Sequence, residues 1–336
     1  MTTTLKDVAR EARVSLASVS RALNGTGVVT ESIRSRVQEV AARLHYVPNI
    51  GAQSLMARRT RMIGVLLPDL QGEYFAELIR GIDVAARARG LHLLISNSHN
   101  GPDDFGEALR AMYGRVDGLL VMAPSLDAHA LQERLQGTLP LVLISTVDVD
   151  RTYCSVYVSN AASAYAMVVH LVSCGHRRIA HVAGPAANID AQERLRGYRD
   201  ALARESVGTA EYVVQGDFTE ESGYRAVKEM LARSPMPEAI FAANDMMAIG
   251  CLSALSEAGM RVPLDIAVVG FDDIPTTRFV SPPLTTVRVR IAELGSRALE
   301  RLAGGIDSPG GLQPFTEVVP GELVIRGSCG RTTKTA

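Results

Sequence analysis

The chain has 336 residues, more than one simple hydrophobic core accommodates, so two or three domains are expected. Hydrophobic residues make up 47% and charged residues 21%, as in a globular protein, and no run of 18 apolar residues predicts a membrane span. The net charge of −1 conceals an asymmetry: residues 1–60 hold nine Lys/Arg and four Asp/Glu, a net +5, and the remainder carries −6. A basic head suggests contact with a polyanion, although a solvated helical surface gives the same charges.

The N-terminal segment predicts three short helices. The first carries one apolar stripe at helical spacing, and Ser15 is a suitable N-cap for a second helix over about 16–23. Thr30 can cap a third helix, which Pro48 ends. Two short helices joined by a tight turn are typical of a helix-turn-helix. Residues 49–60 read as a linker.

From residue 61 onward, apolar runs alternate with amphipathic segments of about 15 residues, which predicts parallel βαβ units. We expect two doubly wound lobes, with one barrel as the alternative. The lobes cover roughly 61–159 and 160–289, and the segment 290–328 returns to complete both. Strands are expected at 62–69, 91–98, 117–124, 140–146, 178–184, 212–217, 239–245 and 265–273. Helices are expected at 73–89, 102–114, 161–174, 190–204, 220–233 and 246–258, with another between 124 and 140.

Polar residues stand where several of these strands end. Ligands of open parallel sheets sit at the carboxyl ends of the strands, so two lobes can direct these side chains into one cleft. The residues at those ends are Asp69, Asn97, Ser145, Asp217, Asn244, Asp245, Asp272 and Asp273.

Sequence motifs follow one another in order along the chain: "LKDVAREARVSLASVSRALNG", "IGVLLPD", "GHRRIAHVAGP", "AANDMMAIG" and "DIAVVGFDD". This set, which spans essentially the whole chain, resembles the lactose-repressor/galactose-repressor (LacI/GalR) family of bacterial transcription regulators. The resemblance implies an all-α helix-turn-helix DNA-binding head (1–48), a hinge (49–60) and an α/β effector-binding and dimerisation core (61–330). The core lobes, 61–159 plus 290–318 and 160–289 plus 319–328, are expected to be doubly wound parallel sheets like type I periplasmic sugar-binding proteins.

The same resemblance implies the function and the partners. We expect a repressor of carbohydrate uptake or catabolism genes that binds a palindromic double-stranded operator as a homodimer. A small sugar or sugar derivative is expected to release it. The chain ends without the Leu heptads that join some relatives into tetramers, which favours a dimer.

In the head, the resemblance assigns base reading to Leu16 and Ala17. Leu16 offers an apolar contact, for instance to a thymine methyl group, unless it packs inward. Hydroxyl, amide and guanidinium groups suit phosphates and base edges. The further DNA contacts implied are Ser18, Ser20, Arg21, Asn24, Thr30 and Tyr46.

In the hinge, Asn49, Ala52 and Leu55 match positions that form a minor-groove helix when operator binds. A Leu from each subunit then wedges open a central base step and kinks the DNA. The alternative is that Leu55 packs against the core.

The resemblance also implies an effector site in the cleft. An Arg offers a planar donor fork to adjacent hydroxyls, and aromatic rings stack on the apolar face of a sugar. For Phe75 and Phe218 the alternative is core packing. For Asn244 and Asp245 it is N-capping of the following helix, a role expected of Asp245. The implied effector residues are Asp69, Tyr74, Phe75, Ser145, Asp190, Arg194, Phe218, Asn244 and Asp272.

The chain departs from the family pattern in both parts. Arg13 stands at a turn where Gly is usual and a positive φ is often needed, which Arg tolerates less easily. In the cleft, Val289 replaces a common Gln, Gly72 a common Asn and Ser145 a common Asp. Fewer hydrogen-bonding groups suggest a larger or less hydroxylated ligand.

Other classes of protein have less support. No G-x-S-x-G, P-loop, H-E-x-x-H or G-x-G-x-x-G motif occurs, so we expect no enzyme and no cofactor. The four cysteines lie far apart in the sequence and the histidines show no metal spacing, so no metal site is expected either. The N-terminus lacks the pattern of a signal peptide, which predicts a cytoplasmic protein. The alternatives are a sugar-binding protein without a DNA role and a regulator that needs a corepressor.

Overall fold

The structure is a computed structural model that describes residues 3–24, 29–46, 59–99, 102–126, 131, 133–134, 139–146, 153–205 and 210–330. It divides into two units, Met1–Thr60 and Arg61–Ala336, and each is described by itself. Within the described residues, every helix is too short or too polar to cross a membrane.

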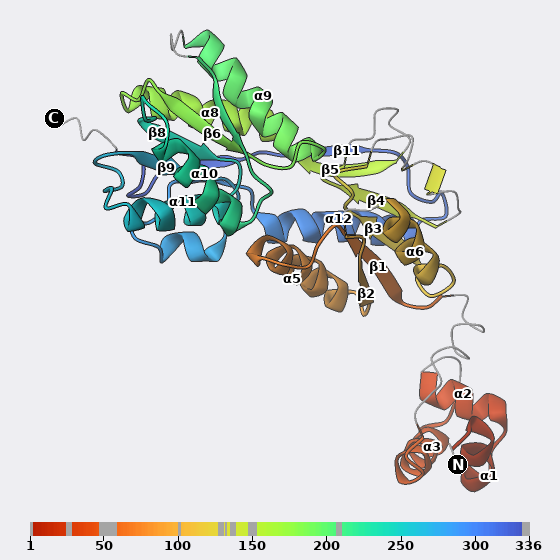
Figure 1. Ribbon diagram of the computed structural model, residues 1–336. Helices are drawn as coiled ribbons and strands as arrows, with labels where there is room; N and C mark the ends of the chain where they lie inside the picture. Colours follow the sequence, from red (N-terminus) through yellow and green to blue (C-terminus); the bar gives the residue numbers. More distant parts are fainter. Residues whose placement is uncertain are drawn as a thin grey trace, which may run out of the picture. The chain divides into compact units, whose positions relative to one another are not determined.

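The described part of the first unit contains the helices α1 (Leu5–Ala12), α2 (Leu16–Asn24) and α3 (Glu31–Arg43), which are labelled in Figure 1. Each is too short to be stable alone in water, so the helices depend on a shared core that includes one fully buried Val from each. Thr4 begins α1 with a capping box: its backbone N–H donates to Asp7 Oδ2 at 3.0 Å. The hydrogen bonds from the Thr4 hydroxyl and backbone hold the pKa of Asp7 below its usual value.

The turn between α1 and α2 has the strain expected from its sequence. Arg13 lies in the left-handed region, with φ 50° and ψ 47°. The predicted cap of α2 is confirmed, because the Ser18 backbone N–H donates to Ser15 Oγ at 3.1 Å. Thr30 occupies the N-cap position of α3, but its hydroxyl contacts Ser32 Oγ at 3.3 Å and makes no capping bond to the helix.

The second unit begins with a six-stranded parallel sheet in the order β11-β5-β4-β3-β1-β2. Helices α5 (Glu73–Ala88) and α12 (Ile291–Asp307) share one core with this sheet, and α6 (Pro102–Met112) packs in a separate core. The strands are β1 (Met62–Leu67), β2 (His92–Asn97), β3 (Gly118–Val121), β4 (Leu141–Ile144), β5 (Cys154–Val158) and β11 (Thr316–Val319).

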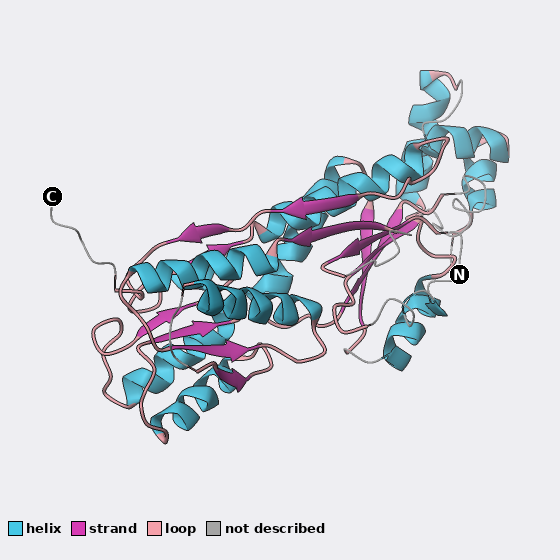
Figure 2. Cartoon of the chain, turned by 90° about the horizontal axis from the view of Figure 1, so that it is seen from above, coloured by secondary structure: helices cyan, strands magenta, loops and turns pink. Residues whose placement is uncertain are grey.

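A second parallel sheet of four strands has the order β7-β6-β8-β9. Its strands are β6 (Ile179–Ala183), β7 (Tyr212–Gln215), β8 (Ala239–Ala242) and β9 (Ala267–Val269). Two helix pairs accompany it, α8 (Asn160–Ser173) with α9 (Ile189–Arg204), and α10 (Glu220–Leu231) with α11 (Asp245–Glu257). Figure 2 shows helices and strands layered in this way.

The two sheets are joined by a chain that crosses between them three times. The crossings follow β5, β10 (Thr286–Arg288) and β11, and after the last one β12 (Glu322–Val324) pairs antiparallel with β10. A short 3₁₀ helix, η1 (Pro275–Arg278), lies between β9 and β10. Two parallel α/β lobes are therefore confirmed, and the barrel alternative is wrong. Strand β5 was not expected from the sequence, and the helix expected between 124 and 140 falls largely outside the described residues.

We predict that Arg13→Gly stabilises the first unit, because glycine adopts the left-handed conformation without the clash that an L side chain suffers there. The free energy of local opening of α1 and α2 should rise by about 1 kcal/mol. Native-state hydrogen exchange on the full chain measures it.

The matched control for this prediction is Gln38→Gly, at an exposed position inside α3. Glycine in a helix interior should lower stability by about 1 kcal/mol. A loss of protection in Arg13→Gly comparable to that of Gln38→Gly would contradict the strain at Arg13.

Candidate functional site

Helix α2 presents a mixed apolar and polar surface to solvent. Leu16 is 43% exposed, so the alternative that it packs inward is wrong. Ala17 and Arg21 are exposed, and Ser18 and Ser20 are half-buried. The Ser18 hydroxyl lies 2.9 Å from that of Ser15. A small-residue helix face with one exposed cation has the size and donor chemistry to enter a DNA groove.

The remaining predicted DNA contacts are less fully described. Thr30 is exposed at the start of α3, and Tyr46 is half-buried against the helical core. Asn24 ends α2, and its side chain lies outside the described part. The hinge residues Asn49, Ala52 and Leu55 also lie outside the described residues.

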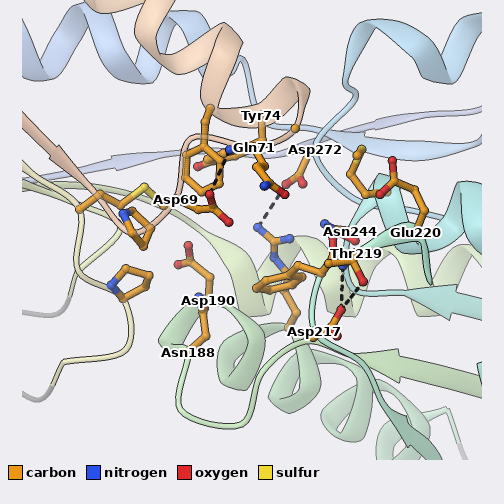
Figure 3. A pocket seen from close by; sticks show the side chains of 18 residues that line it. Asp69, Gln71, Tyr74, Asn188, Asp190, Asp217, Thr219, Glu220, Asn244 and Asp272 are labelled. Carbon is orange, nitrogen blue, oxygen red and sulfur yellow. Dashed lines mark hydrogen bonds and ion pairs between the residues drawn. The ribbon is translucent and has the colours of Figure 1, made fainter. Parts of the chain in front are cut away.

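The second unit contains a cavity of about 320 Å³ between its two sheets. Residues that follow β1 and β3 of the first sheet face residues that follow β6, β7, β8 and β9 of the second. This is the carboxyl-end position expected of ligand sites in parallel sheets. The predicted residues that line it are Asp69, Tyr74, Phe75, Asp190, Arg194, Phe218, Asn244 and Asp272 (Figure 3). Ser145 is 1% exposed and lies outside the lining.

Arg194 is the centre of a buried polar network at one wall of this cavity. It is 4% exposed, and its Nη2 lies 3.2 Å from Asp272 Oδ1. Its Nη1 donates to the carbonyl of Ala243 at 2.6 Å, and its Nε donates to Asn160 Oδ1 at 2.9 Å. Asn160 in turn donates from Nδ2 to Asp190 Oδ1 at 2.8 Å. The guanidinium is therefore fixed in one orientation by three protein groups.

Burial dominates the electrostatics of the network. It raises the pKa of Asp272 to about 7 despite the neighbouring Arg194 guanidinium, and the Asp190 carboxyl adds to the rise. Burial also raises the pKa of Asp190, against the opposing effect of Arg194. The environment of the two carboxyls therefore disfavours the state in which both Asp190 and Asp272 are ionised.

Aromatic rings form the apolar part of the cavity. Tyr74 and Phe75, in the first turn of α5, meet edge to face with ring centroids 5.5 Å apart. The Arg194 guanidinium carbon lies 5.9 Å from the centroid of Phe218. Phe75 and Phe218 also pack against the two hydrophobic cores, so each ring serves the core and the cavity.

The helix α11 is capped by Asn244, and the expected cap at Asp245 is wrong. Asn244 Oδ1 accepts from the Met247 backbone N–H at 2.9 Å, and its Nδ2 donates to the carbonyl of Phe218 at 2.9 Å. Asp245 is the first residue of the helix and fully buried. Its carboxylate accepts from the Ile274 backbone N–H at 3.0 Å and from the Thr286 hydroxyl at 2.5 Å. Asp245 therefore ties α11 to the segment that follows β9.

Sequence reasoning did not assign several lining residues as effector contacts. They come from the N-termini of α5, α9 and α10 and the turns before them, where a cap residue or a strand-end acid was the available signal. They are Gln71, Asn188, Asp217, Thr219 and Glu220. Asn160 has no such signal, because it reaches Arg194 only through the fold.

The family departures occupy different places. Gly72 lines the cavity with φ 85°, and Glu73 accepts a hydrogen bond from the Thr276 backbone N–H at 3.0 Å. Glu73 therefore links the start of α5 to η1 instead of facing the cavity. Val289 is fully buried and lies outside the lining.

Acidic side chains outnumber basic ones in the lining. Among the described residues, five carboxyl groups and one guanidinium line the cavity, and that guanidinium is already paired with Asp272. The acids are Asp69, Asp190, Asp217, Glu220 and Asp272.

Comparison with known proteins agrees with this architecture. Residues 4–49 match the family model "Bacterial regulatory proteins, lacI family", and residues 168–329 match the "Periplasmic binding protein-like domain". The ribose operon repressor of Haemophilus influenzae is 33% identical over 308 residues, covering 91% of this chain and 92% of the relative.

Two solved structures extend the similarity over the whole chain. The lac repressor dimer bound to operator and the anti-inducer ONPF has a TM-score of 0.90 and 30% identity, covering 98% of this chain and 99% of that one. The complex of the transcriptional regulator CelR with cellobiose has a TM-score of 0.73 and 31% identity, covering 97% and 99%.

The chain belongs to the LacI family: it is a DNA-binding transcriptional repressor with a helix-turn-helix and a periplasmic-binding-protein-like core. The sequence prediction of this family and fold is confirmed, and membership places the chain among regulators that are not enzymes.

We predict that the buried Asp272 makes the folded chain less stable as the pH rises. The pKa of Asp272 is about 7 in the folded state, and an exposed Asp of an unfolded chain has the ordinary value of 3.8. Between these two pH values the folded state therefore keeps a proton that the unfolded state has lost. The contribution of protonated Asp272 to the free energy of unfolding is fully present below pH 4 and is lost as the pH rises from 4 to 7. Above pH 7 the free energy of unfolding no longer changes because of this group. The unfolding free energy of Asp272→Asn, relative to wild type, should therefore rise by up to about 1.4 kcal/mol per pH unit across that window.

Urea unfolding at a series of pH values measures this difference. The control is Asp265→Asn, since a salt bridge and hydrogen bonds from Arg261 lower the pKa of Asp265 to about 2. Its difference from wild type should be flat from pH 5 to 7. A flat difference for Asp272→Asn as well would contradict the raised pKa.

Proposed function

We propose that this repressor binds a palindromic operator as a homodimer and is released by a neutral, hydroxylated effector such as a sugar or nucleoside. The regulated genes then belong to the uptake or catabolism of that compound. The observation that carries the proposal is an exposed α2 face on a basic unit, joined in one chain to a cavity with a fixed Arg and aromatic walls.

The head supplies both kinds of DNA contact. Leu16 and Ala17 face solvent at the start of α2 and act as apolar base readers. Arg21 supplies a phosphate or guanine contact, with further contacts from Ser18, Ser20, Asn24, Thr30 and Tyr46. The lac repressor dimer bound to operator supports a two-fold arrangement on two half-sites.

In this proposal the hinge bends the operator DNA. Asn49 and Ala52 form part of a minor-groove helix, and Leu55 from each subunit wedges into the central base step. The family match supports the assignment at Asn49, and the similarity to the lac repressor dimer bound to operator, which covers 98% of this chain, supports the rest.

The lining of the cavity favours an uncharged ligand. A phosphate or carboxylate placed there meets five acidic side chains, and the guanidinium of the described lining already lies against Asp272. Hydroxyl groups, by contrast, can donate to Asp69 and Asp190 and accept from Asn188, while Tyr74 and Phe218 cover apolar ring faces. A relative solved with cellobiose supports this class. Ser145 lies behind the lining and acts on the ligand only through its neighbours.

The position of the cavity explains how binding reaches DNA. The effector bridges residues of the first lobe, such as Tyr74, to residues of the second, such as Arg194. It therefore stabilises one arrangement of the lobes over another, and operator affinity changes by the difference between its affinities for the two states. Release on binding follows when the favoured arrangement separates the two hinges.

We predict separate effects for two substitutions on α2. Leu16→Ala should remove about 1–3 kcal/mol of discrimination between operator and mismatched DNA and leave the salt dependence unchanged. Arg21→Ala should weaken binding to all sequences and reduce the slope of log K against log salt by about 0.9 per contact. Operator is first selected from random duplexes with the full-length protein, and both quantities are measured by fluorescence anisotropy.

The control is Arg233→Ala, which removes an exposed cation just after α10, in the second unit. It should change neither quantity. Equal sequence preference in Leu16→Ala and wild type would contradict the assignment of Leu16 as a base reader.

A further inference from the structure

A second cluster of metal-ligating side chains lies away from the cavity, at the end of α8. His170 is in the last turn of this helix and Cys174 is its C-cap, one turn further on. Cys329 reaches them from the segment after β12, although it is more than 150 residues away in sequence. This separation in sequence explains why no sequence motif predicted the cluster.

The two nitrogen–sulfur distances within the cluster are those of a coordination sphere. His170 Nε2 lies 3.4 Å from Cys329 Sγ and 3.6 Å from Cys174 Sγ. The three ligand atoms lie within 4.8 Å of one another. A tetrahedral zinc ion, with Zn–N of about 2.0 Å and Zn–S of about 2.3 Å, separates its imidazole nitrogen and thiolate ligands by about 3.6 Å.

Both sulfur atoms approach the same ring nitrogen. One nitrogen carries one lone pair or one hydrogen, which serves a single partner in the plane of the ring. A metal ion between the three atoms can bind both sulfurs and the nitrogen at once. Two thiolates with one imidazole are ligands that suit zinc and exclude calcium and magnesium.

The surroundings hold one ligand in place and leave access to the others. Cys329 is fully buried. Its carbonyl accepts from His176 Nε2 at 3.1 Å, and the preceding Ser328 hydroxyl donates to the Val268 carbonyl at 2.5 Å. His170 and Cys174 are half-buried, so an ion can enter from their side.

We propose that His170, Cys174 and Cys329 bind a thiophilic divalent cation, with Zn²⁺ as its natural occupant and water in the fourth position. Binding releases the two thiol protons to solvent and forms one metal–nitrogen and two metal–sulfur bonds. The ion fastens the segment around Cys329 to the end of α8. All three ligands belong to the second unit, and none of them lines the effector cavity.

The test is a titration of the reduced, full-length protein with Co²⁺, which absorbs visible light strongly when bound tetrahedrally by thiolates. We expect one Co²⁺ per chain, displaced by Zn²⁺. Cys174→Ser and Cys329→Ser should each weaken binding by at least about 100-fold, because loss of a ligand costs more than loss of an outer partner. The control Cys251→Ala removes a buried thiol elsewhere in the same lobe and should bind like wild type.

Thermal unfolding guards against variants that fold poorly. Zn²⁺ should raise the melting temperature of wild type and of Cys251→Ala, and EDTA should reverse the rise. Cys174→Ser, at a half-buried position, should melt like metal-free wild type and show no response. Absence of Co²⁺ uptake by wild type, equal uptake by the cysteine variants, or a Cys174–Cys329 disulfide without metal uptake by the reduced protein would each overturn the proposal.

Discussion

The buried ion pair between Arg194 and Asp272 is the constraint around which the core is organised. A guanidinium taken out of water needs polar partners to replace the water that it loses. Here two hydrogen bonds, to Asn160 and to a backbone carbonyl, and an ion pair with Asp272 provide them. Arg194 lies on α9, and its partners come from α8 and the ends of β8 and β9, so the network fixes four elements of the second lobe against one another. Because the guanidinium is already oriented, a ligand that contacts it does not have to order this side chain, and that entropic cost of binding is avoided.

The crossing pattern of the chain links this fixed site to the rest of the core. Three connections join the lobes, and they follow β5, β10 and β11. The first leads directly into Asn160, a member of the buried network. A change in how the lobes meet is therefore felt at the site, and a ligand in the site biases how the lobes meet.

Local patterns predicted most of this protein. The alternation of apolar runs and amphipathic segments predicted both lobes and most helix ends. Polar residues at strand ends predicted Asp69, Asn244 and Asp272 as lining residues, because the topology alone brings such strand ends together. What failed depends on partners distant in sequence. Asp245 has the residue type and the position of a helix cap, but its carboxylate accepts hydrogen bonds from the start of η1 and from β10 instead. The cluster of His170, Cys174 and Cys329 likewise exists only once the C-terminal segment has packed against α8.

The most direct test of the account is whether the cavity accepts neutral hydroxylated ligands and refuses their anionic counterparts. Thermal unfolding of the full-length protein is measured with matched pairs, each a sugar or nucleoside and its phosphate, and repeated with Arg194→Ala. The account predicts an upward shift with at least one neutral member, of about 2.7 kcal/mol at 100 times its dissociation constant. Its phosphate should give no shift, and Arg194→Ala should lose the response. A phosphorylated or acidic sugar that stabilises wild type more than its neutral partner would contradict it.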